Sequence, residues 1–170
     1  MEEFDIPIHG LKEGIHNYRF EIKTSFFEYF GNPDLPGGNL ILNLSLLKSN
    51  QFIEFNFNIS GTLVLLCDRC LEEFDFEVEV KEKIIVRFGE KFEELDNNII
   101  IISRETSRFN LSQYIYEFAV LSIPYKKVHP GQGEKVCNPE MIKKLNELSA
   151  EENNILYKTD PRWDNLKNLN

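Results

Sequence analysis

The chain has 170 residues, 42% of them hydrophobic, and a formal net charge of −9. This length is enough for one domain with a substantial core. The acidic balance argues against binding of free RNA by charge alone, because the molecule as a whole repels phosphate. No apolar run approaches the length of about 18 residues that a membrane span needs, and the first residues carry no signal-peptide pattern. The three cysteines are too few, and odd in number, for a disulfide-stapled secreted domain, so we expect a cytoplasmic protein without membrane contact.

The first two thirds of the chain have the alternation of β-strands. Apolar and polar residues alternate in 15–23, 53–60 and 74–81, and leucines occupy every second position in 40–46. A period of two is typical of strands with one buried and one solvated face. In two of these strands the pattern predicts a common core that includes Phe55, Phe57, Phe76 and Val78. A short helix is expected at Ser25, because Ser25 and Glu28 match a capping box.

The acidic residues around 93–96 are expected to form a solvated, charge-rich loop. After it the periodicity becomes helical. Asn110 and Gln113 match a second capping box, and apolar residues then recur at helical spacing until Pro124. Because that segment is apolar on nearly all sides, it predicts a buried helix.

A second C-terminal helix is expected after the loop 125–136, with Asn138 as N-cap and Pro139 at the first helical position. Its apolar residues are expected to be buried: Met141 or Ile142, Leu145 and Leu148. Residues 151–158 are polar and are interpreted as a linker. A third helix is expected to start at Asp160-Pro161.

Strands followed by helices indicate an α+β protein. We expect a curved, mainly antiparallel sheet or a partly open barrel, followed by C-terminal helices. A single domain would cover residues 1–170, with 1–103 mainly β, 110–149 helical, and 151–170 a linker and tail helix.

Cys67 and Cys70 stand two residues apart in the predicted turn between two strands. This setting resembles a zinc knuckle more than a redox site, because a redox C-x-x-C uses a helix N-terminus to lower its thiol pKa. Cys137 and His129 would complete a Cys3His set, which is an accepted donor set for structural zinc. The long spacing between the two halves leaves two alternatives open, namely two reduced thiols in a turn or a reversible disulfide.

The sequence carries no positive sign of catalysis. It has no Gly-rich phosphate loop and no distinct Ser-His-Asp order, and His9 and His16 have no partner pattern. The tail is more informative, because Arg162 and Trp163 are residue types enriched at interface hot spots. A lone Trp near a chain end can instead cover the core. We consider four residues as candidate partner contacts: Arg69, Arg162, Trp163 and Lys167.

Several of these segments, in this order, resemble the YceD family of bacterial and plastid proteins, which are called large ribosomal RNA subunit accumulation proteins. The resemblance runs from about Leu11 onward and is carried by Cys67-Asp68-Arg69-Cys70-Leu71 with Phe74, Leu121-Ser122-Ile123-Pro124, Cys137, and Asp160-Pro161-Arg162-Trp163 with Leu166 and Leu169. Many members have a further cysteine pair in the C-terminal segment. This chain has only Cys137 there, with His129 nearby, and so departs from a four-thiolate zinc site.

The resemblance implies a non-enzymatic ribosome-biogenesis factor that supports accumulation of large-subunit ribosomal RNA. Its expected partners are large-subunit assembly intermediates or ribosomal proteins, with only weak direct binding to naked RNA because of the chain's charge. Zinc is the one cofactor that the sequence suggests. The alternative function is a zinc- or thiol-containing protein-interaction module unrelated to ribosomes.

Overall fold

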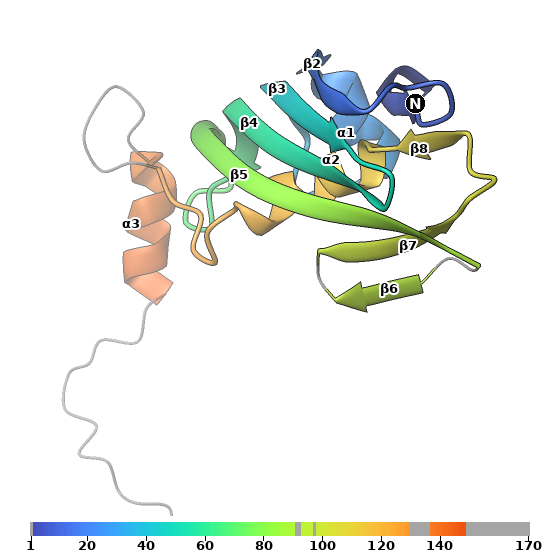
Figure 1. The fold of residues 1–170 in the computed structure, drawn as a ribbon. Coiled ribbons are helices and arrows are strands. Elements are labelled where there is room, and N and C mark those ends of the chain that lie inside the picture. Colours follow the sequence, from blue (N-terminus) through green and yellow to red (C-terminus); the bar gives the residue numbers. More distant parts are fainter. Residues whose placement is uncertain (1, 91–92, 97, 130–136, 149–170) are drawn as a thin grey trace, which may run out of the picture.

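The computed structural model describes residues 2–90, 93–96, 98–129 and 137–148, and it shows an α+β protein with an open, curved sheet (Figure 1). The main sheet has six strands in the order β2-β3-β4-β5-β7-β6, and β1 and β8 form a separate pair. The strands are β1 (Asp5–Pro7), β2 (Gly14–Ile22), β3 (Gly37–Lys48), β4 (Phe52–Leu66), β5 (Glu73–Gly89), β6 (Glu93–Asp96), β7 (Ile99–Ser103) and β8 (Arg108–Asn110). The helices are the 3-10 turn η1 (Glu2–Phe4), α1 (Thr24–Phe30), α2 (Ser112–Leu121) and α3 (Pro139–Leu148).

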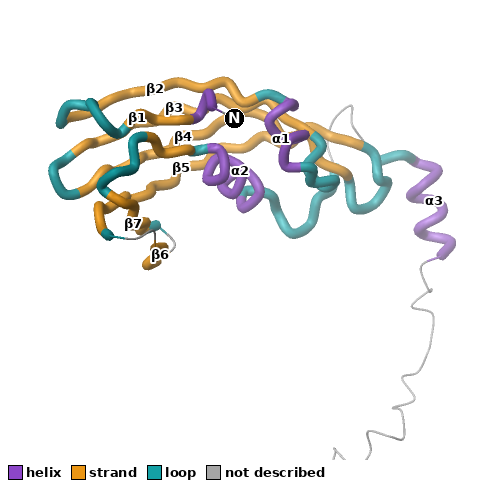
Figure 2. The backbone as a smooth tube through the Cα atoms, turned by 90° about the vertical axis from the view of Figure 1, so that its right-hand side faces the viewer, coloured by secondary structure: helices purple, strands orange, loops and turns teal. Residues whose placement is uncertain are grey.

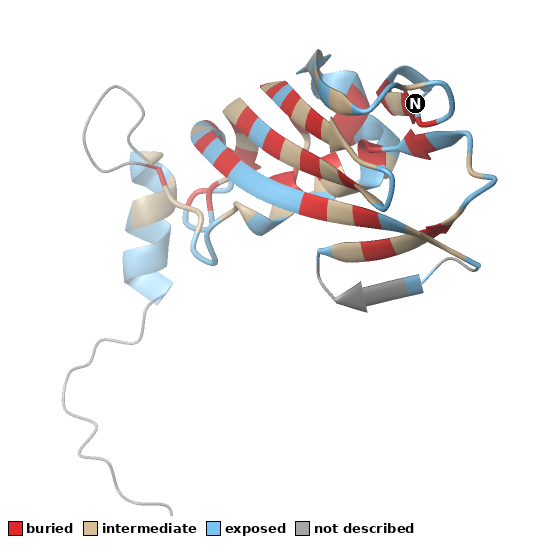
Figure 3. Cartoon of the chain, viewed as in Figure 1, coloured by how far each residue is buried: buried red, intermediate tan, exposed pale blue. Residues whose placement is uncertain are grey.

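Strands β2 to β5 form an antiparallel meander, and β7 pairs with β5 in parallel. The sheet is not closed, since β2 and β6 are its edges, so the predicted fold class holds in its open-sheet form. Burial alternates along the strands as the sequence predicts (Figure 3). All four leucines at positions 40, 42, 44 and 46 are buried.

One face of the sheet is covered by α1 and α2, and the core lies between them and the strands (Figure 2). Phe55, Phe57 and Val78 are buried there, and Phe76 is partly buried against the same cluster, which confirms the predicted common core. The Phe57 ring packs edge-on against Phe118 of α2 with centroids 5.2 Å apart. Among the described residues, no helix lies on the opposite face of strands β2 to β5 (Figure 2).

Neither predicted capping box forms in full. The N-cap of α1 is Lys23, without a side-chain cap bond, so Ser25 lies inside the helix. In α2 the N-cap position is Leu111, which makes no side-chain cap bond, but Asn110 Oδ1 accepts a hydrogen bond from the Ser112 N–H (2.9 Å), so the Asn110 half of the second box is present. The Gln113 side chain donates to Glu117 Oε1 (2.9 Å), one turn further along the helix, instead of reaching back to the N-terminus. Local side-chain bonds of this kind compete with capping.

Two predictions of burial are also wrong. Helix α2 buries only one face and ends at Leu121, which is 80% exposed, so it is not enclosed on all sides. Helix α3 begins at Pro139 as predicted, and Asn138 Oδ1 accepts a hydrogen bond from the Glu140 N–H (3.0 Å). None of its residues is buried, however, and Leu148 is 84% exposed, because α3 extends away from the sheet (Figure 1).

Two further expectations concern residues 93–96 and the segment after α3. Residues 93–96, expected to be a loop, form the edge strand β6, which pairs with β7. The predicted linker and the helix expected at Asp160 lie outside the described residues. No helix in the described part of the chain has the length and apolar character to cross a membrane.

Candidate metal centre

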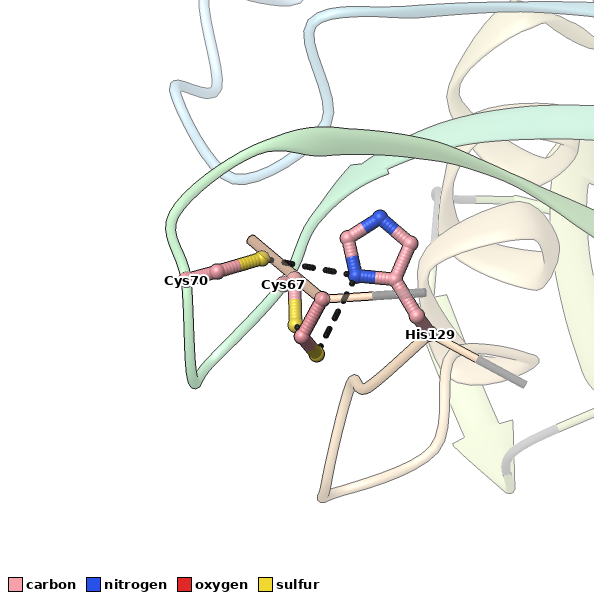
Figure 4. A group of neighbouring side chains, drawn as sticks. Cys67, Cys70 and His129 are labelled. Carbon is pink, nitrogen blue, oxygen red and sulfur yellow. Dashed lines mark hydrogen bonds between the residues drawn. The ribbon is translucent and has the colours of Figure 1, made fainter. Parts of the chain in front are cut away.

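The structure brings the four predicted ligands together. Cys67, Cys70, His129 and Cys137 each offer one donor atom, and these atoms all lie within 4.8 Å of one another (Figure 4). Cys67 and Cys70 are buried, Cys137 is half-buried, and His129 is 8% exposed. The three cysteines are free thiols rather than disulfides. Convergence of all four donors favours a metal-binding cluster over two unconnected thiols in a turn.

The spacing of the donors fits a tetrahedral metal ion. With Zn–S bonds of about 2.3 Å and Zn–N bonds of about 2.0–2.1 Å, a regular tetrahedron places two sulfurs about 3.8 Å apart and a sulfur and a nitrogen about 3.5 Å apart. The Cys67 and Cys137 sulfurs are 3.7 Å apart. His129 Nδ1 lies 3.4 Å from Cys70 Sγ and 3.5 Å from Cys137 Sγ. The donor set and these three distances therefore match tetrahedral coordination of an ion such as zinc.

The first two ligands sit in a tight turn between β4 and β5. The Leu71 N–H donates to the Cys67 carbonyl and the Cys67 N–H donates to the Glu72 carbonyl, both at 2.9 Å. This closure requires a left-handed backbone at Leu71 (φ 60°), and no other non-glycine residue in the described part of the chain has positive φ. The Leu71 side chain is 67% exposed, so its packing does not offset the strain of this conformation.

The turn also directs backbone N–H groups at the Cys67 sulfur, which affects the pKa of this thiol. Burial raises the pKa of the Cys67 thiol, but hydrogen bonds from the backbone of Cys70, Arg69 and His129 outweigh it and lower that pKa to about 6. For Cys137, burial and the neighbouring Cys67 and Cys70 sulfurs raise the pKa. One thiolate therefore forms readily, while a further thiolate beside it needs a compensating cation, which a bound metal ion would supply.

The turn and the C-terminal loop are joined on one side of the donors by Asp68 and Lys127. The Asp68 N–H donates to the Lys127 carbonyl (2.7 Å), and the Lys127 N–H donates to Asp68 Oδ2 (2.6 Å). The Lys127 ammonium lies 3.9 Å from Asp68 Oδ1 and 3.6 Å from Asp34 Oδ1. These contacts hold the two segments together through protein groups alone. No periodicity or spacing in the sequence pointed to this pair.

On the other side of the donors, Asn138 Nδ2 donates to Glu72 Oε1 (2.9 Å), which attaches the start of α3 to the turn. The His129 ring lies against Phe74 with centroids 5.1 Å apart. Each ligand segment is therefore positioned by neighbours that are not themselves ligands.

Of the four candidate partner contacts, the structure describes one. Arg69 lies in the turn between Cys67 and Cys70 and is exposed. Arg162, Trp163 and Lys167 lie outside the described residues. The sequence left His9 and His16 without a role. In the structure the Nε2–H of His9 donates to the Arg104 carbonyl (3.1 Å) and that of His16 donates to the Lys12 carbonyl (2.9 Å), which are structural contacts.

The fold and the cluster together define an α+β protein in which a C-x-x-C turn between strands faces a Cys and a His from a C-terminal loop. Residues 55–170 match the family YceD, described as large ribosomal RNA subunit accumulation protein YceD, and the chain belongs to this family. The uncharacterized protein YlbN of Bacillus subtilis (strain 168) is 29% identical over 125 residues, which cover 72% of this chain and 69% of that protein. No solved structure matches the chain.

Proposed function

We propose that this protein is a non-enzymatic ribosome-biogenesis factor that supports accumulation of large-subunit ribosomal RNA in the cytoplasm. The observation that carries the proposal is the family match, which spans the C-x-x-C turn, both described C-terminal helices and the tail. The protein would act through contacts with large-subunit assembly intermediates or ribosomal proteins. An acidic chain with a net charge of −9 is suited to basic protein partners.

We further propose that the cluster holds one structural zinc ion. Three thiolates and one imidazole form a soft, closed donor set, which is typical of structural rather than catalytic zinc. Since all four positions would be filled by Cys67, Cys70, Cys137 and His129, none is left for a water or substrate. The ion would fix the turn to the loop before α3 and so set the direction of that helix.

The partner contacts would come from residues near this centre and from the tail. Arg69 is exposed beside two of the ligands and can reach a partner without disturbing the core. Arg162, Trp163 and Lys167 combine the cationic and aromatic side chains that dominate interface energetics. Their role as contacts is inferred from residue type and from the family match that includes them.

Depletion of the protein tests the ribosomal assignment. In gradient profiles we expect mature large-subunit particles to fall relative to small ones, while precursor RNA accumulates or is degraded. Arg162→Glu and Trp163→Ala should reproduce part of the defect with an unchanged unfolding midpoint, whereas Arg104→Glu, a charge change elsewhere, should not. If Trp163 instead covers the core, Trp163→Ala will destabilise the protein and Arg162→Glu will have little effect.

The second candidate function is that of a zinc- or thiol-containing interaction module unrelated to ribosomes. The Cys3His cluster favours it, because the geometry of the cluster does not depend on any ribosomal role. Normal particle profiles after depletion, together with one bound zinc per chain, would support this module and remove the ribosomal assignment.

A further inference from the structure

The helix-free face of the main sheet carries two adjacent rows of polar side chains, here called the amide rows. They follow the pairing register across four strands, one row being Asn17, Ser45, Asn56 and Lys83 and the other Arg19, Asn43, Asn58 and Lys81. In Figure 1 this face of β2 to β5 lies in front of α1 and α2. At about 4.8 Å between strands, the rows extend about 14 Å.

This face is hollowed. A cavity of about 830 Å³ lies over the rows. It is lined by all eight of their residues and by Tyr18, Leu44, Phe57, Glu82 and Asn98. Its charged lining residues are three cations, Arg19, Lys81 and Lys83, and one anion, Glu82. Cations thus outnumber anions in the lining itself, and Glu79 and Glu54, which pair with Lys81 and Lys83, lie outside it. A site of this sign suits an anionic ligand.

The amides have no evident structural use. Asn is depleted in strands, and exposed positions of central strands are better filled by Thr or other β-formers. In the described part of the chain, the side chains of Asn17, Asn43 and Asn58 make no hydrogen bond, while Asn56 donates to Glu54 Oε1 (3.0 Å). Three adjacent strands thus present free amide donors and acceptors to the cavity.

The cations are equally available. Arg19 has no ion-pair partner within the described residues. Lys81 pairs with Glu79 (2.7 Å) and Lys83 with Glu54 (3.8 Å), but both lysine side chains are about half or more exposed. Exposed pairs of this kind contribute little and are readily exchanged for a stronger anion.

We propose that the amide rows bind single-stranded RNA. Carboxamides carry both donors and acceptors and so can pair with base edges, while the three cations reach the phosphates. Single strands are favoured because their base edges are free, whereas A-form duplexes hide them in a deep, narrow groove. The choice of RNA among anionic polymers rests on the proposed function.

The site would be small and its affinity low. A four-stranded sheet of this width contacts about two or three nucleotides in known RNA-binding folds. The amide rows include no aromatic ring, and the two aromatic residues of the lining, Tyr18 and Phe57, pack into the core, so base stacking adds little to the binding energy. The face would hold RNA in an assembly that other contacts keep together, which agrees with the weak binding to naked RNA expected from the charge of the chain.

The test uses the full-length protein and a labelled, mixed-sequence RNA of ten nucleotides, with fluorescence anisotropy as readout. We expect dissociation constants within the range of about 10⁻⁴–10⁻⁶ M typical of non-specific binding. With three phosphate contacts, a plot of the logarithm of the association constant against the logarithm of the salt concentration should have a slope of about −2. Arg19→Gln should reduce the magnitude of this slope by about 0.7. Arg104→Gln, which removes the same charge from the loop after β7, should change neither slope nor affinity.

A double variant separates recognition from folding. Asn43→Thr with Asn58→Thr replaces two free amides by residues that favour strands, so the thermal midpoint should stay the same or rise. Binding should weaken about three- to tenfold, as expected for lost polar contacts. Absence of RNA binding, or binding that neither Arg19→Gln nor the double variant weakens, would overturn the proposal. Either result would leave the particle-profile test of the ribosomal role unaffected.

Discussion

Replacing Cys137 by Ser is the most direct test of the metal centre. Its sulfur lies 3.7 Å from that of Cys67 and 3.5 Å from His129 Nδ1, so it joins the turn to the loop. Cys137 is also less buried than Cys67 or Cys70, so the substitution perturbs packing least. Native protein purified without chelator should contain about one zinc per chain, and the variant far less.

The loss of stability can be worked out from mass action. A ligand present at 1,000 times its dissociation constant stabilises the folded state by about 4 kcal/mol. For a chain of this size, 1 kcal/mol corresponds to about 2–4 °C in the unfolding midpoint. We therefore expect Cys137→Ser to melt about 8–16 °C below the zinc-bound protein when followed by circular dichroism.

A chelator provides the matched control. Excess chelator should bring the native protein down to the midpoint of Cys137→Ser and should leave the variant unchanged, because both then lack the ion. The reasoning would be refuted by native protein that is folded without metal and melts at the same temperature as the variant.

Two further predictions concern the core and the strained turn. Phe57 is 2% exposed and packs on Phe118, so Phe57→Ala should lower the free energy of unfolding in urea by about 3–5 kcal/mol. Phe76→Ala should lower it less, because Phe76 is only partly buried. Equal and small losses for the two variants would show that the predicted core does not form. Leu71→Gly should stabilise the protein by about 0.5–1 kcal/mol, since it relieves a left-handed conformation, whereas Leu71→Ala keeps that strain. A glycine variant that melts below the native protein would contradict the strain argument.

The meander and the first half of the metal cluster could be predicted from sequence because their signals are local. The alternation of apolar and polar residues in β3, β4 and β5 specifies which side chains face inward. A single layer of helices on one face of the sheet is enough to bury those side chains. Likewise, Cys67 and Cys70 lie within one turn, so their proximity follows from chain geometry. Period and spacing were therefore sufficient for these parts.

The parts that could not be predicted depend on where distant segments meet. The amphipathic pattern of α3 predicts burial, but the position of this helix is set by Cys137 and by the bond between Asn138 and Glu72, which direct it away from the core. The pair β1–β8 involves three residues per strand, which is too short for a periodic signal. The contact between Asp68 and Lys127 that aligns the ligand segments has no sequence signature.

The β1–β8 pair also constrains when the chain can fold. Phe4 packs against Phe20 and Phe26, which follow soon after it, but Asp5 pairs with Asn110, so β1 has no strand partner until more than a hundred further residues have been made. At about 5–20 residues per second, that interval lasts about 5–20 s during synthesis. For this time the backbone N–H and C=O groups of β1 lack their partners in β8.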